Sequence, residues 1–489
     1  MGGKYLVRTF GCQMNEHDSE RIAGVLQEQG LEPTSDLEDA DVVVFNTCCI
    51  RENADNKLYG NLGALEALRK TKPSMQIAVG GCLAQKDGAL IRRRAPHVDV
   101  VFGTFNVGSV GRLLERARRE GPQIELLDSA GDAGSEELAA YPSALPVRRE
   151  LSHAAWVTIQ VGCDNGCAFC IVPSVRGREI SRPFAEVVEE VRQLASQGVV
   201  EVTLLGQNVN SYGRDITTTL RSQVAGPGDH LLAGEDWAAQ PRRRPRPLFG
   251  DLLRAVGSIA GIARVRFTSP HPKDLRPETI AAMAETDTVC EQLHLPLQSG
   301  SDRVLAAMRR GYTAERYLDR LAAARAAIPD LAVTTDIIVG FPGETERDFE
   351  ATLEVVSEAA YDSAYTFQFS PRPGTRAAEM VDLYVPKEVV SERFARLAVV
   401  VERSSLARHR ARVGRTEEVL VEGPARKDPS KVAARTRQHK LVLLDRSAEL
   451  RPGSFTSARI VASGAHHLQG EVVEGIRHPK RIRLALAGS

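Results

Sequence analysis

The segment from Gln160 to Pro183 reads QVGCDNGCAFCIVPSVRGREISRP and sets the organisation of the chain. It places Cys163, Cys167 and Cys170 in a Cys-x3-Cys-x2-Cys array directly after an apolar, β-branched run. Three thiolates at this spacing can hold three corners of one iron–sulfur cluster, because a tight loop lets their sulfurs converge. No fourth Cys or His lies nearby in sequence, whereas structural zinc normally has four closed ligands. The array therefore predicts a cluster with one iron open to a small chelating molecule, and a zinc knuckle is the alternative.

The composition is that of a globular protein of about three domains. Of the 489 residues 43% are apolar, and 63 Lys and Arg balance 63 Asp and Glu, so the net charge indicates no class of partner. From Glu402 to the end, however, 18 Lys and Arg stand against 9 Asp and Glu, an excess that suits a polyanion. Eight cysteines are too few for a disulfide scaffold, which favours a reducing cytoplasm and metal chemistry. No apolar run approaches the roughly 18 residues of a membrane span, so we expect no membrane partner.

Residues 1–120 alternate short apolar runs with helical patterns, which is typical of an open βα sheet with mainly parallel strands. Strands are predicted at 5–10, 42–45, 77–79 and 98–102, and helices at 19–29 and 52–69. Cys12, Cys48 and Cys82 each follow the carboxyl end of a different strand, the edge at which such sheets bind ligands. A second three-cysteine cluster site is therefore expected. The alternative is that these cysteines only pack at the strand ends.

The central part of the chain, residues 151–386, predicts a second βα domain. Residues 121–150 lack periodicity and are interpreted as a linker before it. Strands are predicted at 157–161, 200–205, 265–268, 292–297, 333–339 and 365–369. Six units are too few for a closed (β/α)8 barrel and fit a partial (β/α)6 barrel with its active site at the strand carboxyl ends. Residues 216–247, rich in Gly, Pro and Arg, predict a disordered surface insertion.

The last part of the chain predicts a connecting helix and a small β domain. Residues 387–411 carry an apolar stripe at helical spacing. In residues 412–482, short strand-like runs at 418–421, 440–444, 457–461 and 468–473 alternate with turn and basic residues. This pattern favours a small OB-like β-barrel with a positive face for RNA. The predicted fold class is therefore α/β, with an N-terminal open βα sheet, a central partial (β/α)6 barrel and a C-terminal β-barrel.

Longer motifs indicate a family. They read TFGCQMNEHDSE, NTCCIREN, GGCLAQ, GCDNGCAFCIVPSVRGREISRP, LLGQNVNSYG, HLPLQSGSDRVLAAMRRGYT, DIIVGFPGETERDF and FSPRPGT. In order and spacing they closely resemble the tRNA methylthiotransferases, which are radical S-adenosylmethionine (SAM) enzymes. The resemblance covers almost the whole chain, including a terminal segment similar to the TRAM RNA-binding domain. Relatives acting on a ribosomal protein typically read GCPKN and those acting on threonylcarbamoyl-adenosine read GCKVN, so the GCQMN that begins at Gly11 favours the MiaB family.

The resemblance implies a function and two [4Fe-4S] clusters. Cys163, Cys167 and Cys170 would hold the radical SAM cluster, while Cys12, Cys48 and Cys82 would hold an auxiliary cluster that carries or donates sulfur. The implied radical SAM methylthiotransferase converts N6-isopentenyladenosine at tRNA position 37 to its 2-methylthio derivative. One SAM would methylate the sulfur and a second would give the 5′-deoxyadenosyl radical that removes a hydrogen from adenine carbon 2.

The resemblance also implies partners. These are the tRNA anticodon loop with isopentenyl-adenosine, SAM, an electron donor such as flavodoxin or ferredoxin, and a sulfur source. A monomer is compatible with the sequence, which does not itself indicate an oligomeric state. Two alternatives stay open. One is a methylthiotransferase for threonylcarbamoyl-adenosine tRNA or a ribosomal protein. The other is a non-catalytic iron–sulfur or zinc RNA-binding protein.

SAM contacts are expected at the rim of the predicted barrel, where loops follow the strands. The candidates are Gln207 and Asn208 after the second strand, Gln298, Ser299 and Ser301 after the fourth, and Gly340 to Glu344 after the fifth. The segment GFPGETERDF is also a good helix start, because acidic residues favour a helix amino end. These contacts are therefore predictions of position, with a structural role as the alternative for Glu344.

Other residues carry weaker predictions. Arg176 and Arg178 suit a phosphate or carboxylate clamp, since a guanidinium forks onto such groups. Arg372 could reach RNA or substrate or form an exposed ion pair, whereas His294 and Cys290 are interpreted as structural.

The vicinal pair Cys48–Cys49 departs from the family, which usually has Ser or another small residue at the second position. Cys49 could therefore replace Cys48 as a ligand. We prefer Cys48 because it follows Asn46-Thr47 directly.

Overall fold

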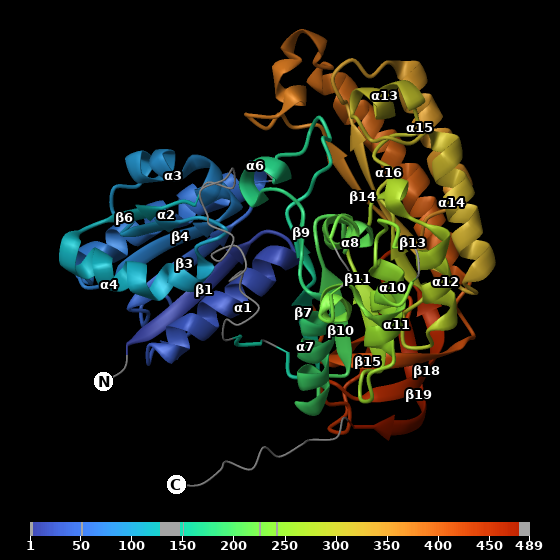
Figure 1. Ribbon diagram of the computed structural model, residues 1–489, viewed down its shortest axis with the longest axis horizontal. Helices are drawn as coiled ribbons and strands as arrows, with labels where there is room; N and C mark the ends of the chain where they lie inside the picture. Colours follow the sequence, from blue (N-terminus) through green and yellow to red (C-terminus); the bar gives the residue numbers. More distant parts are fainter. Residues whose placement is uncertain are drawn as a thin grey trace. The chain divides into compact units, whose positions relative to one another are not determined.

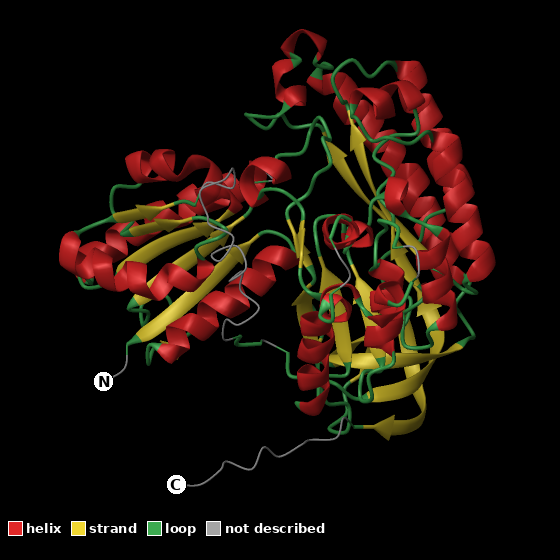
Figure 2. Cartoon of the chain, in the orientation of Figure 1, coloured by secondary structure: helices red, strands yellow, loops and turns green. Residues whose placement is uncertain are grey.

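The computed structural model describes residues 3–49, 52–127, 147–149, 151–223, 226–240 and 243–478 (Figures 1 and 2). The chain divides into two units. The first consists of Met1–Glu150, Val161–Asn165 and Cys170–Glu179, and the second of Leu151–Gln160, Gly166–Phe169 and Ile180–Ser489. The boundary between the units runs through the cysteine loop, so that Cys163 and Cys170 belong to the first unit and Cys167 to the second.

The first unit is a parallel sheet. Its strands are β1 (Lys4–Phe10), β2 (Glu32–Pro33), β3 (Val42–Thr47), β4 (Gln76–Gly81), β5 (Val100–Phe102) and β6 (Gln123–Glu125). They lie in the order β2-β1-β3-β4-β5-β6, and all neighbours pair in parallel. Every residue of β3 and β4 is buried, as expected for strands covered on both faces. The predicted open parallel sheet is confirmed.

Helices cover both faces of this sheet. Helices α1 (Gln13–Glu28) and α4 (Val110–Glu120) pack on one face through Ile22, Leu26, Val110 and Leu113. Helices α2 (Glu52–Thr71) and α3 (Cys82–Arg94) supply Leu58, Leu62, Leu83 and Ile91 to the other face. Two predicted boundaries are wrong. The first helix begins six residues before the predicted Ser19, at Gln13, and the predicted linker begins inside the sheet, because residues 123–125 form its edge strand.

The second unit holds the partial barrel. Its strands are β7 (Ala154–Thr158), β10 (Glu201–Leu205), β11 (Arg264–Phe267), β12 (Gln292–His294), β13 (Ala332–Val339) and β14 (Ser363–Gln368). They form two parallel three-stranded sheets, β11-β10-β7 and β12-β13-β14. A parallel bridge between Val265 of β11 and Val289, just before β12, continues the curve from one sheet to the next. The predicted partial (β/α)6 barrel is confirmed.

Further helices and short strands complete the two units. Helix α6 (Val172–Arg176) belongs to the first unit. The helices between the barrel strands are α7 (Phe184–Ser196), α11 (Phe249–Gly257), α12 (Pro277–Glu285), α13 (Asp302–Ala307), α14 (Ala314–Ala327) and α15 (Glu346–Ala359), and the short strands are β8 (Gln160–Val161) and β9 (Ile180–Ser181). Single 3-10 turns occur at Val107–Ser109, Val209–Ser211, Pro272–Asp274, Arg376–Glu379 and Val381–Leu383. Ser301, Thr313 and Thr345 start α13, α14 and α15 because each hydroxyl accepts a hydrogen bond from a backbone N–H of the first turn.

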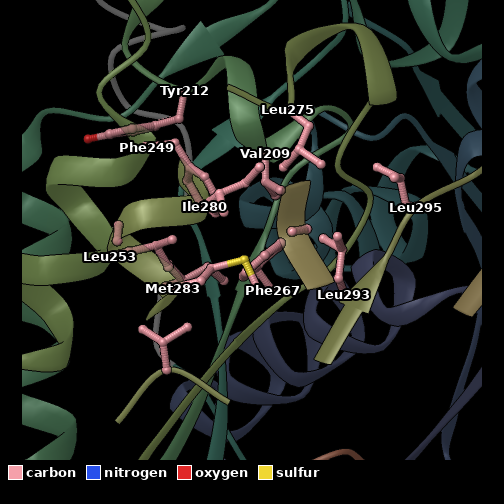
Figure 3. Close-up of a cluster of buried hydrophobic side chains, with 14 of the residues drawn as sticks. Val209, Tyr212, Phe249, Leu253, Phe267, Leu275, Ile280, Met283, Leu293 and Leu295 are labelled. Atoms are coloured by element: carbon pink, nitrogen blue, oxygen red, sulfur yellow. The ribbon is translucent and has the colours of Figure 1, made fainter. Parts of the chain in front are cut away.

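One large apolar core holds the barrel and its helices together. Figure 3 shows Phe267 of β11 and Leu293 of β12 beside Ile280 and Met283 of α12, with Phe249 of α11 close by. The rings of Phe249 and Phe267 meet edge to face with their centroids 5.1 Å apart. This core fixes the strands, and thereby the loops at their carboxyl ends.

The predicted disordered insertion is wrong for the residues that the structure describes. They form α8 (Arg214–Arg221), α9 (Asp229–Ala233) and α10 (Glu235–Ala238). Trp237 is fully buried in the barrel core, and its indole N–H donates to the Arg244 carbonyl at 3.0 Å. A few apolar anchors such as Trp237 order this segment, and anchors spaced without a period leave no helical signal in the sequence.

The second unit ends in the predicted small β-barrel. Helix α16 (Lys387–Arg410) leads to β15 (Thr416–Pro424), β16 (Lys431–Thr436), β17 (Leu441–Asp445), β18 (Phe455–Ser463) and β19 (Leu468–Arg477). These strands close into a barrel in the order β15-β16-β17-β19-β18. Strand β16 was missed in the sequence, because KVAART holds a single large apolar residue, Val432.

In the part of the chain that the structure describes, no helix has the length and apolar character needed to cross a membrane.

Buried arginines join the two barrels of the second unit. Arg264 of β11 donates to the Arg435 carbonyl at 2.8 Å, and Arg266 donates to the carbonyls of Thr436 and Arg437 at 3.0 and 2.8 Å. Arg264 is fully buried, and Arg266 is 5% exposed. Charge-assisted hydrogen bonds of this kind are stronger than neutral ones, so the C-terminal barrel is held by more than its chain connection.

Candidate active site

Strand register gathers the three N-terminal cysteines. Phe10 of β1 pairs with Thr47 of β3, and Thr47 pairs in turn with Gly81 of β4. Cys48 and Cys82 follow these paired residues directly, and Cys12 comes two residues after Phe10. Three residues that lie far apart in the sequence therefore share one edge of the sheet, as predicted from their places at strand ends.

Asparagines of the same motifs fix the loops that carry these cysteines. The Asn15 amide donates to Asn46 Oδ1 at 3.2 Å, and the Asn46 amide donates to the Asn15 carbonyl at 2.7 Å and to Ser19 Oγ at 3.0 Å. The Cys12 thiol lies 3.4 Å from Asn15 Oδ1. Both asparagines are fully buried. The motifs GCQMN and FNTC therefore supply the asparagines that fix the loop conformation as well as the cysteine thiols.

Gly81 is required where β4 turns into α3. Its φ of 93° lies in the region that favours glycine. An added Cβ would come within 2.4 Å of Asn46 Oδ1 and 2.5 Å of the Thr47 carbonyl oxygen. The close approach of the two loops therefore depends on a residue without a side chain.

The N-terminal thiols lie close enough to shift one another's pKa. A hydrogen bond from Cys48 lowers the pKa of Cys12, and a hydrogen bond from Cys49 lowers that of Cys82. The positive charge of Arg176 lowers both further, while burial opposes the shift. The pKa of Cys49 is raised by its hydrogen bond to Cys82 and by burial. Because the thiolate is the metal ligand, this environment favours ligation by Cys12 and Cys82.

Arg176 is the buried cation of this cysteine edge. It was predicted as a carboxylate or phosphate clamp, and it donates to Asp18 Oδ2 at 2.7 Å, with both side chains at most 4% exposed. Asp18, on α1, was missed in the sequence because nothing in GCQMNEHDSE distinguishes it from its acidic neighbours. A guanidinium beside Cys12 and Cys82 suits a site that holds anionic thiolates.

The cysteine loop is shaped by glycines. Gly162 has a φ of 72°, and an added Cβ would lie 1.9 Å from the Arg178 carbonyl oxygen. The backbone N–H of Cys163 donates to the Gly177 carbonyl at 3.2 Å. Residues 162–163 are therefore held against residues 177–178, which brings the two ends of this loop together within the first unit.

In the second unit, Cys167 has a buried cationic partner. Arg310 Nη1 donates to Cys167 Sγ at 3.3 Å, and Arg310 Nε lies 3.1 Å from the Tyr312 hydroxyl. Arg310 is 6% exposed. It lies in the motif MRRGYT, and only its folded position distinguishes it from the exposed Arg309 beside it. Arg310 is thus a functional candidate that sequence reasoning missed.

The cysteines are not preset around one ion. In the described residues, no group of three or more His, Cys, Asp or Glu side chains is arranged so that it could hold a single metal ion. The assignment of Cys12, Cys48, Cys82, Cys163, Cys167 and Cys170 as cluster ligands therefore stays a prediction. Their chemistry fits it, because iron–sulfur clusters are held by thiolates.

The carboxyl edge of the barrel carries buried polar atoms that lack a partner among the described residues. They are both amide atoms of Gln207, Asn208 Oδ1, Gln298 Oε1, His271 Nε2 and Gln160 Oε1. Buried polar groups are normally hydrogen-bonded, so such a group of exceptions at one strand edge fits a polar ligand such as SAM. Three predicted SAM contacts, Gln207, Asn208 and Gln298, are in this set; His271 and Gln160 were not predicted.

The other predicted SAM contacts are tied to helices. Ser301 Oγ donates to Asp348 Oδ1 of α15 at 2.6 Å, and Ser299 Oγ lies 3.3 Å from Thr352 Oγ1. The Gly340 N–H donates to Glu344 Oε1 at 3.0 Å, and the buried Glu344 carboxylate pairs with Arg393 of α16 at 2.9 Å. These side chains brace the rim loops, and their contact with SAM stays a prediction.

The weaker candidates divide into structural and exposed residues. His294 is held by Thr334 Oγ1 at 2.9 Å and Asp336 at 3.4 Å, which fits the structural interpretation, although it is half-buried instead of in the core. Cys290 is 2% exposed, and burial raises the pKa of its thiol. Arg178 is exposed and Arg372 is half-buried in the last barrel loop, so the roles predicted for them remain predictions.

A partial parallel barrel with a cysteine loop after its first strand defines the class: the chain is a radical SAM protein. The model of the Radical SAM superfamily matches residues 157–356, and the model described as "Uncharacterized protein family UPF0004" matches residues 4–103. The chain belongs to the family of tRNA-2-methylthio-N(6)-dimethylallyladenosine synthases.

Relatives of that name are similar over nearly the whole chain. The protein of Acidothermus cellulolyticus is 53% identical over 481 residues, which cover 97% of this chain and 89% of the relative. That of Mycobacterium sp. (strain JLS) is 52% identical over 482 residues, which cover 95% and 88%. Among solved structures, the radical S-adenosylmethionine methyltransferase TsrM from Kitasatospora setae matches with a TM-score of 0.49 and 13% identity over 77% of this chain and 75% of that one. The family resemblance found in the motifs is confirmed.

Proposed function

We propose that this protein converts N6-isopentenyladenosine at tRNA position 37 to 2-methylthio-N6-isopentenyladenosine. The single observation that carries the proposal is similarity at 52–53% identity, over at least 95% of the chain, to synthases of that name. By its family the protein is a radical SAM transferase, and its cofactors are SAM and [4Fe-4S] clusters. The alternatives with another acceptor or with no catalysis are not favoured.

The cofactors supply the difficult chemistry and the chain supplies their environment. When bound, SAM and the two clusters supply the radical, the sulfur and the methyl group that replace the hydrogen on adenine carbon 2. In our proposal Cys12, Cys48 and Cys82 hold one cluster and Cys163, Cys167 and Cys170 hold the other. Acid and base side chains cannot remove an unactivated hydrogen. In our proposal the residues of this chain therefore bind and orient the cofactors and the substrate adenosine, and they exclude water from the site.

Particular side chains are suited to these roles. Arg176 places a positive charge beside Cys12 and Cys82. Arg310 orients the Cys167 side chain through its hydrogen bond. Gln207, Asn208 and Gln298 offer the polar groups of SAM buried amide atoms that have no hydrogen-bond partner in the described part of the chain.

Exposed basic residues of the C-terminal barrel are proposed to hold the tRNA backbone. Arg426, Lys427, Arg446 and Arg451 are exposed and have no acidic partner among the described residues. Arg446 donates to the Pro429 carbonyl and to that of Ser430, so its loop lies against the loop of Arg426 and Lys427. Contacts from such a cluster would be salt-dependent and carry little sequence information. Specificity would come from the unpaired adenosine, which can enter a pocket without opening a duplex.

The proposed reaction also requires an external electron donor and an external sulfur source. The reaction needs an electron that no residue provides, so a donor such as flavodoxin or ferredoxin is part of the proposal, together with a sulfur source. We place the reaction in the cytoplasm, where its tRNA substrate is found.

Nucleoside analysis tests the proposal. A bacterial strain that lacks its own synthase would be complemented with this chain or with its Cys163→Ala variant, and its tRNA digested for mass spectrometry. We expect the methylthio group on isopentenyl-adenosine with the wild type and bare isopentenyl-adenosine with the variant. A methylthio group on threonylcarbamoyl-adenosine, or on a ribosomal protein aspartate, would replace the proposed acceptor.

A further inference from the structure

A cavity of about 250 Å³ lies where α14 and α16 end in the second unit. Its charged lining consists of Arg325 and Asp330 near the end of α14, Asp362 before β14, and Arg408, Arg412 and Arg415 at the end of α16. Figure 1 shows α14, α15 and α16 on one side of the partial barrel. The lining residues Leu331 and Asp362 directly precede β13 and β14, whereas the rim residues described above follow the strands, and the proposed reaction assigns this cavity no role.

Pairing leaves an excess of positive charge in this cavity. Asp362 pairs with the buried Lys440 at 2.7 Å, and Asp330 pairs with Arg412 at 2.9 Å and with Arg415 at 3.1 Å. Glu417 also pairs with Arg412, at 2.7 Å. Four arginines and Lys440 thus stand against three carboxylates, which leaves two positive charges unbalanced.

The two unbalanced charges belong to Arg325 and Arg408. Neither has a carboxylate partner in the described part of the chain, and both donate to the same acceptor, the Ala360 carbonyl, at 3.1 and 3.0 Å. Arg325 Nε is buried and has no hydrogen-bond partner among the described residues. Burial and the neighbouring Arg408 guanidinium lower the pKa of Arg325, and the Asp362 carboxylate opposes this shift.

Helix capping explains only part of this arrangement. Ala360 ends α15, and a cation near a helix C-terminus is stabilising. One guanidinium would be enough for that carbonyl, and a second adds repulsion in a partly buried place. Arginine has five N–H donors, so most donors of the pair are left for another acceptor.

We propose that this cavity binds a phosphate group, held between the guanidinium groups of Arg325 and Arg408. Arginine forks match phosphate oxygens, and a phosphate would balance the two unpaired charges. The Arg415 and Asp330 side chains that line the cavity are 51% and 43% exposed, so a phosphate of a large molecule can enter from solvent. Arg412 and Arg415 connect α16 to β15, the first strand of the proposed RNA-binding barrel. The phosphate is therefore taken to be one of the tRNA backbone, a choice of source that rests on the proposed function.

Inorganic phosphate tests the site without tRNA. Thermal unfolding of the full-length protein would be compared in phosphate and in chloride at equal ionic strength. We expect phosphate to raise the melting temperature of the wild type and of Arg403→Gln, an exposed arginine of α16 outside the cavity, and to have no specific effect on the Arg325→Gln/Arg408→Gln double variant. A wild type that does not distinguish phosphate from chloride overturns the site. If the double variant does not fold, Arg408→Lys takes its place. It keeps the positive charge but loses the two-pronged guanidinium, so phosphate should bind it about 10-fold more weakly than the wild type.

The salt dependence of tRNA binding tests the source. Loss of two phosphate-facing charges should weaken tRNA binding and reduce the slope of log K against log salt by about 1 to 2, with Arg403→Gln unchanged. Loss of the phosphate effect with unchanged tRNA binding would support the site and overturn tRNA as the source, leaving a free phosphate. A wild type that modifies tRNA but ignores phosphate overturns this inference alone, whereas failure to modify tRNA overturns the proposed function and leaves the phosphate result standing.

Discussion

The two cysteine sets of this protein both follow the carboxyl ends of strands, but different parts of the fold bring the members of each set together. Cys12, Cys48 and Cys82 are spread over three βα units and meet because Phe10, Thr47 and Gly81 are paired across adjacent strands. Cys163, Cys167 and Cys170 lie within one loop and need no long-range pairing to be close in the chain. The first set therefore depends on the whole sheet, and the second on local turns such as that at Gly162.

The two sets also differ in their polar surroundings. The N-terminal set is surrounded by fixed neighbours, namely the Asn15–Asn46 pair and the Arg176–Asp18 ion pair. At Cys167 the structure places one buried arginine, Arg310. Variants that alter only one of the two sets should therefore differ in whether they affect sulfur insertion, SAM cleavage or folding.

The largest expected effect comes from removing one cysteine of each set. Cys163→Ala should abolish reductive SAM cleavage, because its cluster would lose a ligand. Cys12→Ala should spare that cleavage and abolish methylthiolation. After anaerobic reconstitution each variant should retain about half of the wild-type iron, and 5′-deoxyadenosine should form only with Cys12→Ala. Loss of SAM cleavage in both variants would show that the sets do not act separately.

Breaking the buried ion pair should affect the first set and its fold. Arg176→Gln leaves Asp18 buried without its cation, which costs about 3–5 kcal/mol of stability. We expect lower thermal stability and loss of the auxiliary iron, with SAM cleavage retained where the protein remains folded. Arg178→Gln, two residues away and exposed, is the matched control and should keep the wild-type thermal stability and auxiliary iron. Equal behaviour of the two variants would contradict the role given to Arg176.

Removal of the Arg310 hydrogen bond should affect the second set alone. Partners of metal ligands typically contribute about 10- to 100-fold to activity, so Arg310→Gln should slow SAM cleavage by that factor. A change in kcat with an altered spectrum of the reduced cluster would separate this role from simple destabilisation. The exposed neighbour Arg309→Gln is the control. An unchanged spectrum together with an unchanged rate would contradict the role given to Arg310.

The smallest effect is expected at Cys49. This thiol donates to Cys82 and lies in an apolar cluster, so Cys49→Ala should cost about 1 kcal/mol for the lost buried atom and keep both clusters. Cys48→Ala should lose the auxiliary iron. Iron counts on the two variants decide between the cysteines, and the reverse result would exchange their roles.

Much of the fold could be predicted because hydrophobic periodicity survives in strongly patterned elements. The six barrel strands and the connecting helix were predicted close to their observed positions. The insertion could not be predicted, since Trp237 and a few other anchors order it through contacts with distant residues. Strand β16 (KVAART) was missed for a related reason: in isolation its small and charged residues do not resemble a strand.

At the candidate site, residue type was predictable and partnership was not. The sequence indicated thiols after strands, and Arg176 as a clamp for an anionic group. It could not indicate that Asp18 is the carboxylate held by Arg176, that Arg310 reaches Cys167, or that Glu344 is occupied by Arg393. Each of these contacts joins residues more than forty positions apart, and such pairs are chosen by packing.

The sequence by itself determined the chemistry of this protein: two sets of three thiols, their order in the chain and the motifs that mark the family. Spacing and residue type are local properties, and they persist in the unfolded chain. Tertiary structure alone decided which charges are balanced. It pairs Arg176 with Asp18 and, among the described residues, gives Arg325 and Arg408 no carboxylate partner, because burial and distance, which set the energy of a charge, exist only in the folded chain.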